Sequence, residues 1–198
     1  FKVFHELMAS KVLEILLVAS PYDAYILEED GSLASKIINE YNGLNLSRPP
    51  RLTRVEGARA ALQKLRDGAY DLVLTMPHLD DMDPFDLGRA IKAVDADLPV
   101  ILLAHSIQGL HPLPAGKDRS GIDGIFIWSG DADLLLAIVK SVEDRLNVEN
   151  DPRIAQVRVL ILVEDSPLYR SYFLPLIYKE VVHQTQEVLD ESLNEEHR

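Results

Sequence analysis

Two acidic residues near the end of the chain stand where an α/β protein could bind a metal ion or a phosphate. Glu164 and Asp165 follow the apolar run 157–163 and precede Ser166 and Pro167, residue types that cap and begin helices. Carboxylates at the end of a strand can be ligands for Mg²⁺, which prefers oxygen. Such a site needs a third carboxylate, and only one helix of sequence follows. We therefore expect no specific metal site here within these 198 residues.

A second acidic group lies in the middle of the chain. The loop that follows the apolar stretch 71–76 contains one histidine and three acids, His78, Asp80, Asp81 and Asp83. Together with Asp23 or His105 from neighbouring strand ends, they could form a metal site at the carboxyl edge of a sheet. A solvated acidic loop is the commoner explanation for such a cluster, and we favour it.

Composition narrows the class of protein. The 198 residues are 47% hydrophobic, which is enough for one sizeable core in a soluble, globular chain. The formal net charge of −12 argues against binding to nucleic acids or anionic membranes. The absence of cysteine excludes disulfides and thiolate sites and fits a cytoplasmic location. No apolar stretch approaches the length of a membrane span. The chain begins with Phe1, which suggests an excerpt from a longer polypeptide.

Apolar runs and helical patterns alternate along most of the chain. Runs typical of strands buried in a parallel sheet occur five times, at 12–20, 51–55, 71–76, 98–104 and 124–128. Helical patterns follow the first three strands and the fifth, at 21–43, 56–69, 85–94 and 131–146. Asp30 and Gly31 should divide the first helix, and the Gly- and Pro-rich loop 105–121 replaces most of the fourth. This alternation predicts an α/β fold with a doubly wound, five-stranded parallel sheet.

The end of the chain repeats its beginning. ILLVASPYDAY at 15–25 resembles LILVEDSPLYRSY at 160–172. Each has an apolar run, then two residues that we call the corner, and then a proline and a tyrosine. The first corner is Ala19-Ser20, and the second is Glu164-Asp165. We therefore expect the following organisation: an N-terminal extension at 1–10, an α/β unit at 11–148, a linker at 149–156, and a strand and long helix at 157–198. Pro175 should kink that helix. Its apolar face should pack on the first unit or on another copy of the chain through Leu174, Tyr178, Val181, Val188 and Leu189.

The stretch YDLVLTMPHLDDMDPFDL, with this order of elements, resembles a bacterial response-regulator receiver domain, or CheY-like domain, over residues 10–148. The resemblance implies a flavodoxin-like sheet of order 2-1-3-4-5. It also implies a phosphorylation site: two acids after the first strand and an aspartate after the third hold Mg²⁺, and that aspartate accepts a phosphoryl group. A hydroxyl after the fourth strand and a lysine after the fifth respond to its charge.

This chain departs from that pattern at each position. The residues that stand in the phosphorylation pocket are Ala19, Ser20, Met76, Ala104 and Trp128. Met76 replaces the phosphoryl acceptor, and a thioether neither attacks phosphorus nor binds Mg²⁺. His105 or Ser106 could shift into the hydroxyl position. The resemblance therefore implies a pseudo-receiver that acts by protein contact in two-component or phosphorelay signalling, without enzymatic activity and without a cofactor.

Two alternatives stay open. Asp80 or Asp81 could be a displaced phosphoryl acceptor, although both lie several residues beyond the strand end. Met76, Trp128 and Tyr22 could line a small-ligand pocket, whereas the simpler explanation is that Met76 and Trp128 fill the volume of a lost charged site.

The second corner, VEDSPLYRSYFLPLIYKE, matches the receiver acid pair and resembles the start of a second receiver-like domain. With residues 1–50, it resembles the N-terminal region of a multidomain signalling protein of the phosphoenolpyruvate-synthase-like or histidine-kinase-like kind. The implied partners are proteins or other domains of the same polypeptide, with a homodimer through 157–198 as a further option. The loop 105–121 could also present a binding surface.

Overall fold

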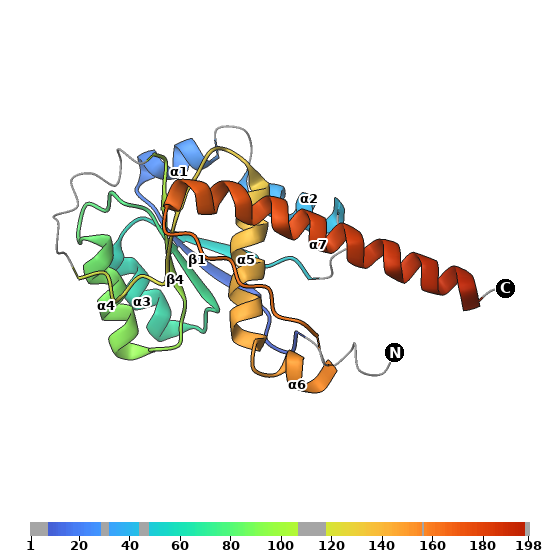
Figure 1. Ribbon diagram of the computed structural model, residues 1–198. Coiled ribbons are helices and arrows are strands. Elements are labelled where there is room, and N and C mark those ends of the chain that lie inside the picture. The colour runs from blue at the N-terminus through green and yellow to red at the C-terminus, as the bar shows by residue number, and fades with distance from the viewer. Residues whose placement is uncertain (1–7, 29–31, 44–47, 107–117, 156, 197–198) are drawn as a thin grey trace.

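The computed structural model describes the protein at residues 8–28, 32–43, 48–106, 118–155 and 157–196, and the side chains of the last helix as far as Gln184 (Figure 1). Within these residues no helix is both long enough and apolar enough to cross a membrane. The loop 107–117 and the side chains of Val188 and Leu189 lie outside this description.

A five-stranded parallel sheet forms the centre of the molecule. Its strands are β1 (Glu14–Val18), β2 (Arg51–Val55), β3 (Leu72–Thr75), β4 (Val100–Ala104) and β5 (Gly124–Ile127). The spatial order is β2-β1-β3-β4-β5, as the resemblance predicted. All four neighbouring pairs are parallel, and Ile15 of β1 lies opposite Leu52 on one side and Leu72 on the other. This register brings the carboxyl ends of β1, β3, β4 and β5 to one edge of the sheet.

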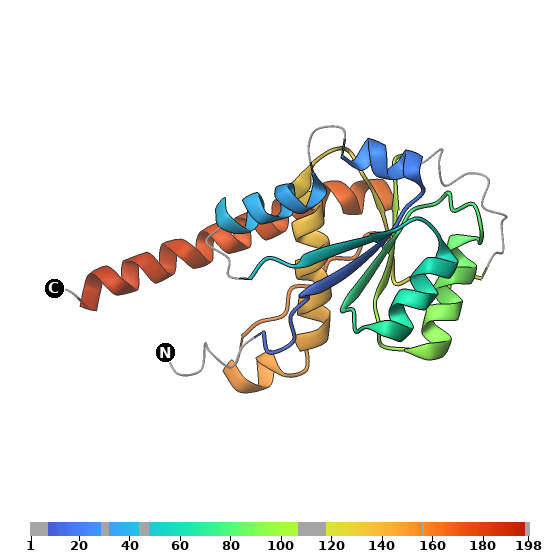
Figure 2. The same cartoon turned by 180° about the vertical axis from the view of Figure 1, so that it is seen from behind.

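Helices cover both faces of this sheet (Figures 1 and 2). The helices that follow the strands are α1 (Pro21–Leu27), α2 (Leu33–Gly43), α3 (Ala58–Asp67), α4 (Pro84–Val94) and α5 (Ala132–Asn147). The first crossover is divided into α1 and α2, as the Asp30-Gly31 step predicts. Ser20 caps α1, because its side chain accepts a hydrogen bond from the Asp23 amide and Pro21 begins the helix.

Alternate residues of each strand enter two different cores, as the two-residue repeat of a strand requires. Ile15 and Leu17 pack with α1, α2 and α5, whereas Leu16 and Val18 pack with α3 and α4. Strands β1, β3 and β4 are almost wholly buried, which explains their nearly continuous apolar sequence.

The sixth strand expected at the start of 157–198 is absent. Residues 157–166 carry no strand assignment and join the short helix α6 (Asp151–Ala155) to the long helix α7 (Pro167–Glu196) as a coil (Figure 1). A strand exists only where a neighbour completes its hydrogen bonds. Here the edge strand β5 is contacted by α7 instead, because the Ile127 amide donates to Ser171 Oγ at 2.7 Å. The predicted linker 149–156 contains α6, and α7 continues through Pro175.

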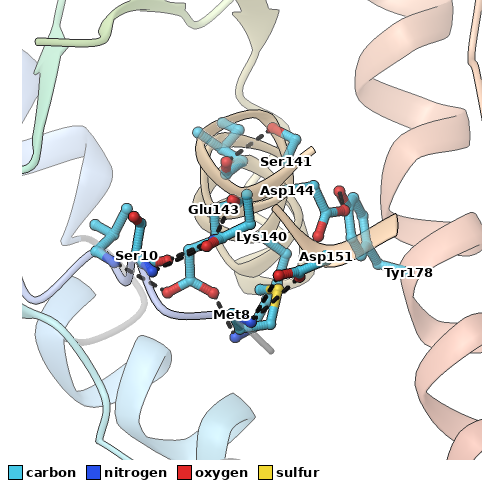
Figure 3. Close-up of polar contacts among 11 residues, drawn as sticks. Met8, Ser10, Lys140, Ser141, Glu143, Asp144, Asp151 and Tyr178 are labelled. Atoms are coloured by element: carbon cyan, nitrogen blue, oxygen red, sulfur yellow. Dashed lines mark hydrogen bonds and ion pairs between the residues drawn. The ribbon is translucent and has the colours of Figure 1, made fainter. Parts of the chain in front are cut away.

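Polar side chains at the end of α5 hold the N-terminal segment in place (Figure 3). The Val12 amide donates to Glu143 Oε1 at 3.0 Å, and the Ser10 amide donates to Asn147 Oδ1 at 2.9 Å. The Met8 amide lies 3.2 Å from Asp151 Oδ2 in the first turn of α6. We call these three contacts the N-terminal clamp. It fixes part of the segment that the sequence marked only as an extension.

Candidate functional site

The sheet topology brings the five positions of the predicted phosphorylation pocket to the same edge. The Met76 amide donates to the Val18 carbonyl at 2.9 Å, and the Trp128 amide donates to the Ala104 carbonyl at 2.7 Å. The Ala19 amide donates to the Val55 carbonyl at 3.1 Å. These bonds extend the parallel pairing by one residue beyond the strands, so each side chain follows its strand end directly.

Apolar side chains fill this edge. All five positions are buried, with exposed fractions of 0% for Ala19, 8% for Ser20, 0% for Met76, 0% for Ala104 and 5% for Trp128. Ala19, Met76 and Trp128 belong to the same core cluster. Tyr22, in contrast, is 71% exposed and does not join Met76 and Trp128 in a common pocket. The geometry therefore favours the interpretation of Met76 and Trp128 as fillers of the site.

One acid does reach this edge, and it comes from α1. Asp23 is 1% exposed, and its carboxylate is held by two neighbours. Ser20 Oγ donates to Asp23 Oδ2 at 3.1 Å, and His105 Nε2 lies 3.2 Å from Asp23 Oδ1. The sequence suggested Asp23 and His105 only as companions of the acidic loop. The contact between Asp23 and His105 forms because β1 and β4 end at the same edge of the sheet. No local sequence motif indicates this contact.

The order of contacts in this group limits its chemistry. A nucleophilic serine needs a base on its hydroxyl and an acid behind that base. Here the carboxylate of Asp23 lies between Ser20 and His105, so the described contacts give the serine no imidazole base. The group satisfies a buried charge, which would otherwise be costly. Its arrangement is that of a helix cap linked to the end of β4.

The acidic loop is used for helix capping. Asp81 accepts hydrogen bonds from the amides of Ala58 and Arg59, both at 2.9 Å, at the N-terminus of α3. Burial raises the pKa of Asp81, but these amide bonds outweigh it and hold the pKa below its ordinary value. Gly57 makes room for this contact, since a Cβ there would lie 2.9 Å from Asp81 Oδ1. The carboxylate of Asp81 is therefore engaged in a structural role.

Asp83 caps the next helix in the same way. Its side chain accepts from the Phe85 amide at 2.9 Å, and Pro84 begins α4. Within the residues that the structure describes, no three His, Asp or Glu side chains are grouped as metal ligands would be. His78, Asp80, Asp81 and Asp83 are thus loop residues of which two cap helices.

The second corner differs from the first in exposure. Glu164 Oε1 accepts from the Ser166 amide at 2.8 Å, and Arg170 donates to the Glu164 carbonyl at 2.9 Å. Asp165 is exposed. Glu164 is half-buried, and the start of α7 lies beside the carboxyl end of β5, where the Ile127 amide donates to Ser171 Oγ. The described residues bring Glu164 and Asp165 no third ligand.

Helix α7 docks on α5 and on the edge strand β5 through one of its faces. Leu174 is 9% exposed and belongs to the core of the α/β unit, and Tyr178 packs against the same cluster. The Tyr178 hydroxyl donates to Asp144 Oδ2, and Lys179 forms an ion pair with Asp133. Of the two arrangements open for this face, contact with the first unit therefore accounts for Leu174 and Tyr178.

Burial makes the Tyr178 to Asp144 contact sensitive to charge. Burial raises the pKa of the Asp144 carboxyl, and the hydrogen bond from Tyr178 offsets only part of that rise. Burial and the neighbouring Asp144 together raise the pKa of the Tyr178 hydroxyl. Neither Asp144 nor Ser171 stood out in the sequence, because polar residues on helices are common. Asp144 of α5 faces α7, and Ser171 of α7 faces β5, and neither pairing is indicated by the neighbouring residues in the sequence.

Asp123 shows the opposite electrostatics just before β5. Its carboxylate contacts Lys92 Nζ and Arg145 Nη2, both at 2.8 Å, and accepts from the Val100 amide at 2.8 Å. Burial raises the pKa of Asp123, but these three partners outweigh it and hold the pKa below its ordinary value. Asp123 therefore joins α4, β4 and α5 in one charged network.

No protein-family model and no curated protein matches this sequence. Solved receiver structures do match its fold. The signal receiver domain of an HD-domain-containing protein from Pseudomonas fluorescens Pf-5 has a TM-score of 0.50 and 23% identity, over 72% of this chain and 95% of that one. A sensor protein from Polaromonas sp. JS666 has a TM-score of 0.52 and 18% identity, over 68% and 98%.

The response regulator TrrA from Thermotoga maritima, solved in complex with Mg²⁺ and BeF, has a TM-score of 0.50 and 21% identity, over 66% of this chain and 98% of its own. Each match covers nearly the whole of the matched chain. The strand order, the helices on both faces and these likenesses agree. About two thirds of this chain has the CheY-like receiver fold.

Proposed function

We propose that the α/β unit is a pseudo-receiver: a module of two-component-type signalling that does not accept a phosphoryl group and acts by contact with other proteins or domains. The observation that carries the proposal is Met76. It lies at the end of β3, where the receiver pattern needs the acceptor aspartate, and it is fully buried. A buried thioether offers no nucleophile for phosphorus and no charge for Mg²⁺.

The rest of the pocket supports the same conclusion. Phosphoryl transfer depends on metal and cationic groups that offset charge on the phosphate. Ala19, Ala104 and Trp128 supply apolar surface instead, and Asp23 is engaged by Ser20 and His105. A phosphate brought to this edge would meet a buried carboxylate and an aromatic ring.

Phosphorylation of a shifted acid is the main competing function. Asp81 is less suited to it than its position suggests, because two amides of α3 already use its carboxylate. Such bonds stabilise the anion and reduce its availability for attack. Asp80 is an exposed loop residue beyond the strand end.

Incubation with acetyl phosphate and Mg²⁺, followed by intact-mass measurement, tests the proposal. We expect no phosphoryl adduct, while a phosphorylatable receiver treated in parallel gains one. An adduct that disappears in Asp80→Asn or Asp81→Asn would replace the pseudo-receiver by a regulator with a shifted acceptor. An adduct that survives both substitutions would equally contradict the proposal.

We also propose that 157–198 begins a second receiver-like unit. Both copies place a serine before a proline at the first turn of a helix, Ser20-Pro21 for α1 and Ser166-Pro167 for α7. The acid pair of the second copy occupies the corner at which the first has Ala19 and Ser20. A partner protein, or another domain, would then contact the module through this second half, in the cytoplasm.

A further inference from the structure

The coil 157–163 exposes an unusual amount of apolar surface. Six of its seven residues are apolar, yet this part of the chain packs poorly against the α/β unit. The exposed fractions are 41% for Val157, 52% for Val159, 68% for Leu160, 79% for Ile161, 37% for Leu162 and 89% for Val163. Contiguous apolar surface of this kind marks a site of interaction.

The backbone of this segment is open as well. Within the described residues, no hydrogen bond joins an amide or carbonyl of 157–163 to another part of the protein. A groove of about 680 Å³ separates the segment from α5 and α7, with Phe126, Val142 and Tyr178 among its lining residues. The segment therefore has the sequence of a strand and the free donors and acceptors of an unpaired edge.

Helix α7 carries a second exposed apolar face. Ser171, Leu174 and Tyr178 face the α/β unit, whereas residues on the opposite side of the helix are exposed. The exposed fractions are 42% for Leu168, 56% for Tyr169, 65% for Tyr172, 42% for Phe173 and 51% for Leu176. The rings of Tyr169 and Phe173 stack with centroids 6.2 Å apart. We call 157–163 together with this face the strand–helix surface.

Charges at the two ends of 157–163 favour antiparallel pairing with the same segment of a second copy. Arg158 lies near its start, and Glu164 and Asp165 lie at its end. In an antiparallel pair of two identical segments centred on Ile161, Arg158 of each copy faces Glu164 of the other. Val159 then faces Val163, and like-charged ends are kept apart. A parallel pair would instead place acids opposite acids, and the net charge of −12 on each chain makes that arrangement costly.

We propose that two copies of this chain associate through the strand–helix surface, with residues 157–163 of each copy paired as antiparallel strands centred on Ile161. Pairing satisfies the open amides and carbonyls and covers the apolar side chains of 157–163. This inference rests on the proposed function, signalling by protein contact, and names the partner as a second copy, whose segment 157–163 takes the place that a neighbouring strand of a second receiver-like unit would otherwise hold.

A charge exchange tests the register of the pair. The variants are Arg158→Glu, Glu164→Arg and the double exchange, compared with the unchanged chain by analytical ultracentrifugation over a range of concentrations. We expect a dimer for the unchanged chain. Each single reversal turns attractive cross-strand pairs into repulsive ones and should weaken dimerisation roughly tenfold or more. The double exchange keeps the net charge of −12 and should restore it to within a few fold.

Arg66→Glu is the matched control, because it makes the same charge change on the exposed surface of α3. A monomeric unchanged chain would overturn the proposal. So would single reversals that the double exchange does not rescue, or an Arg66→Glu effect as large as that of Arg158→Glu. Circular dichroism of each variant confirms folding. The phosphorylation assay is independent of assembly, so a failed dimer and a failed pseudo-receiver are distinguishable.

Discussion

Two corners of this molecule share a local sequence and differ in everything around it. At the first, β1 runs into Ala19, Ser20 and α1, and the corner is buried under Met76 and Trp128. At the second, the coil 157–163 runs into Glu164, Asp165 and α7 and remains open to water. The same strand, corner and helix pattern thus produces a core in one place and a surface in the other.

The different exposure of the two corners determines which carboxylates each one can hold. At the second corner Glu164 is half-buried and accepts from the Ser166 amide, and Asp165 is exposed to solvent. The first corner keeps a single carboxylate, Asp23, and engages it with a hydroxyl and an imidazole. An acid pair at that corner would need Mg²⁺ or comparable cations close by. We therefore expect an acid pair and the cationic groups that offset its charge to be present together or absent together.

Returning an acid to the first corner should have the largest effect. Met76→Asp would place a carboxylate in a fully buried apolar site, and we expect unfolding to become easier by ~3–5 kcal/mol. Urea unfolding followed by circular dichroism measures this. Met76→Leu keeps volume and polarity and should cost less than about 1.5 kcal/mol. Equal losses for the two variants would show that the corner is not a packed core.

Opposite faces of α7 should respond differently to truncation. Leu174→Ala removes a side chain that is 9% exposed and should destabilise by ~2–4 kcal/mol. Leu176→Ala, only two residues away but 51% exposed, should change the stability of the monomer by less than about 0.5 kcal/mol. Urea unfolding at low concentration, where any dimer dissociates, makes the comparison. A larger loss for Leu176→Ala would reverse the assignment of the docked face.

The pH dependence of two aspartates should have opposite signs. The lowered pKa of Asp123 gives stability that is present above about pH 4, its unfolded pKa, and is lost as the pH falls through its folded pKa. The raised pKa of Asp144 favours the fold below about pH 4 and is lost as the pH rises through its folded pKa.

Melting temperatures of two amide variants test these signs. At pH 7 we expect Asp123→Asn to melt a few degrees lower and Asp144→Asn to melt slightly higher than the unchanged chain. At pH 3 both differences should shrink, because the aspartates then approach the neutral state of the amides. A lower melting temperature for Asp144→Asn at pH 7 would mean that its charge holds α7 in place.

Removing an acid from the second corner should have the smallest effect. Asp165→Ala changes an exposed side chain at the start of α7, and we expect a stability change within about 0.5 kcal/mol. Asp23→Ala, by comparison, removes the acceptor of the Ser20 hydroxyl in a buried site and should cost more. Chemical unfolding of both variants completes the comparison of the two corners.

The sheet was predictable because a strand that is buried on both faces is apolar at nearly every position, and this pattern is visible in the sequence. The runs around Leu16, Leu74 and Leu102 are apolar without alternation, and each became a central strand. The run at 157–163 has the same composition but no neighbouring strand. An apolar composition shows that a segment could be buried as a strand, but a strand forms only where another strand lies beside it. For that reason the sixth strand was predicted wrongly.

The site was predictable in its residues but less so in its contacts. Strand ends are counted along the sequence, so Met76 and Trp128 could be placed at one edge. The partners of Asp81 lie 22 and 23 residues away, and those of Asp23 come from two elements. Such pairings follow from strand order and helix orientation, which spacing within a loop does not encode.

The N-terminal clamp has a mechanical consequence. Met8 is held by Asp151 of α6, and Ser10 and Val12 are held by Asn147 and Glu143 at the C-terminal end of α5 (Figure 3). Tension applied at residue 8 is therefore borne first by these side-chain bonds, before it reaches the ladder between β1 and its neighbours. Since α7 docks on the same helix α5, a pull on the N-terminal segment loads the element that positions the second half of the molecule.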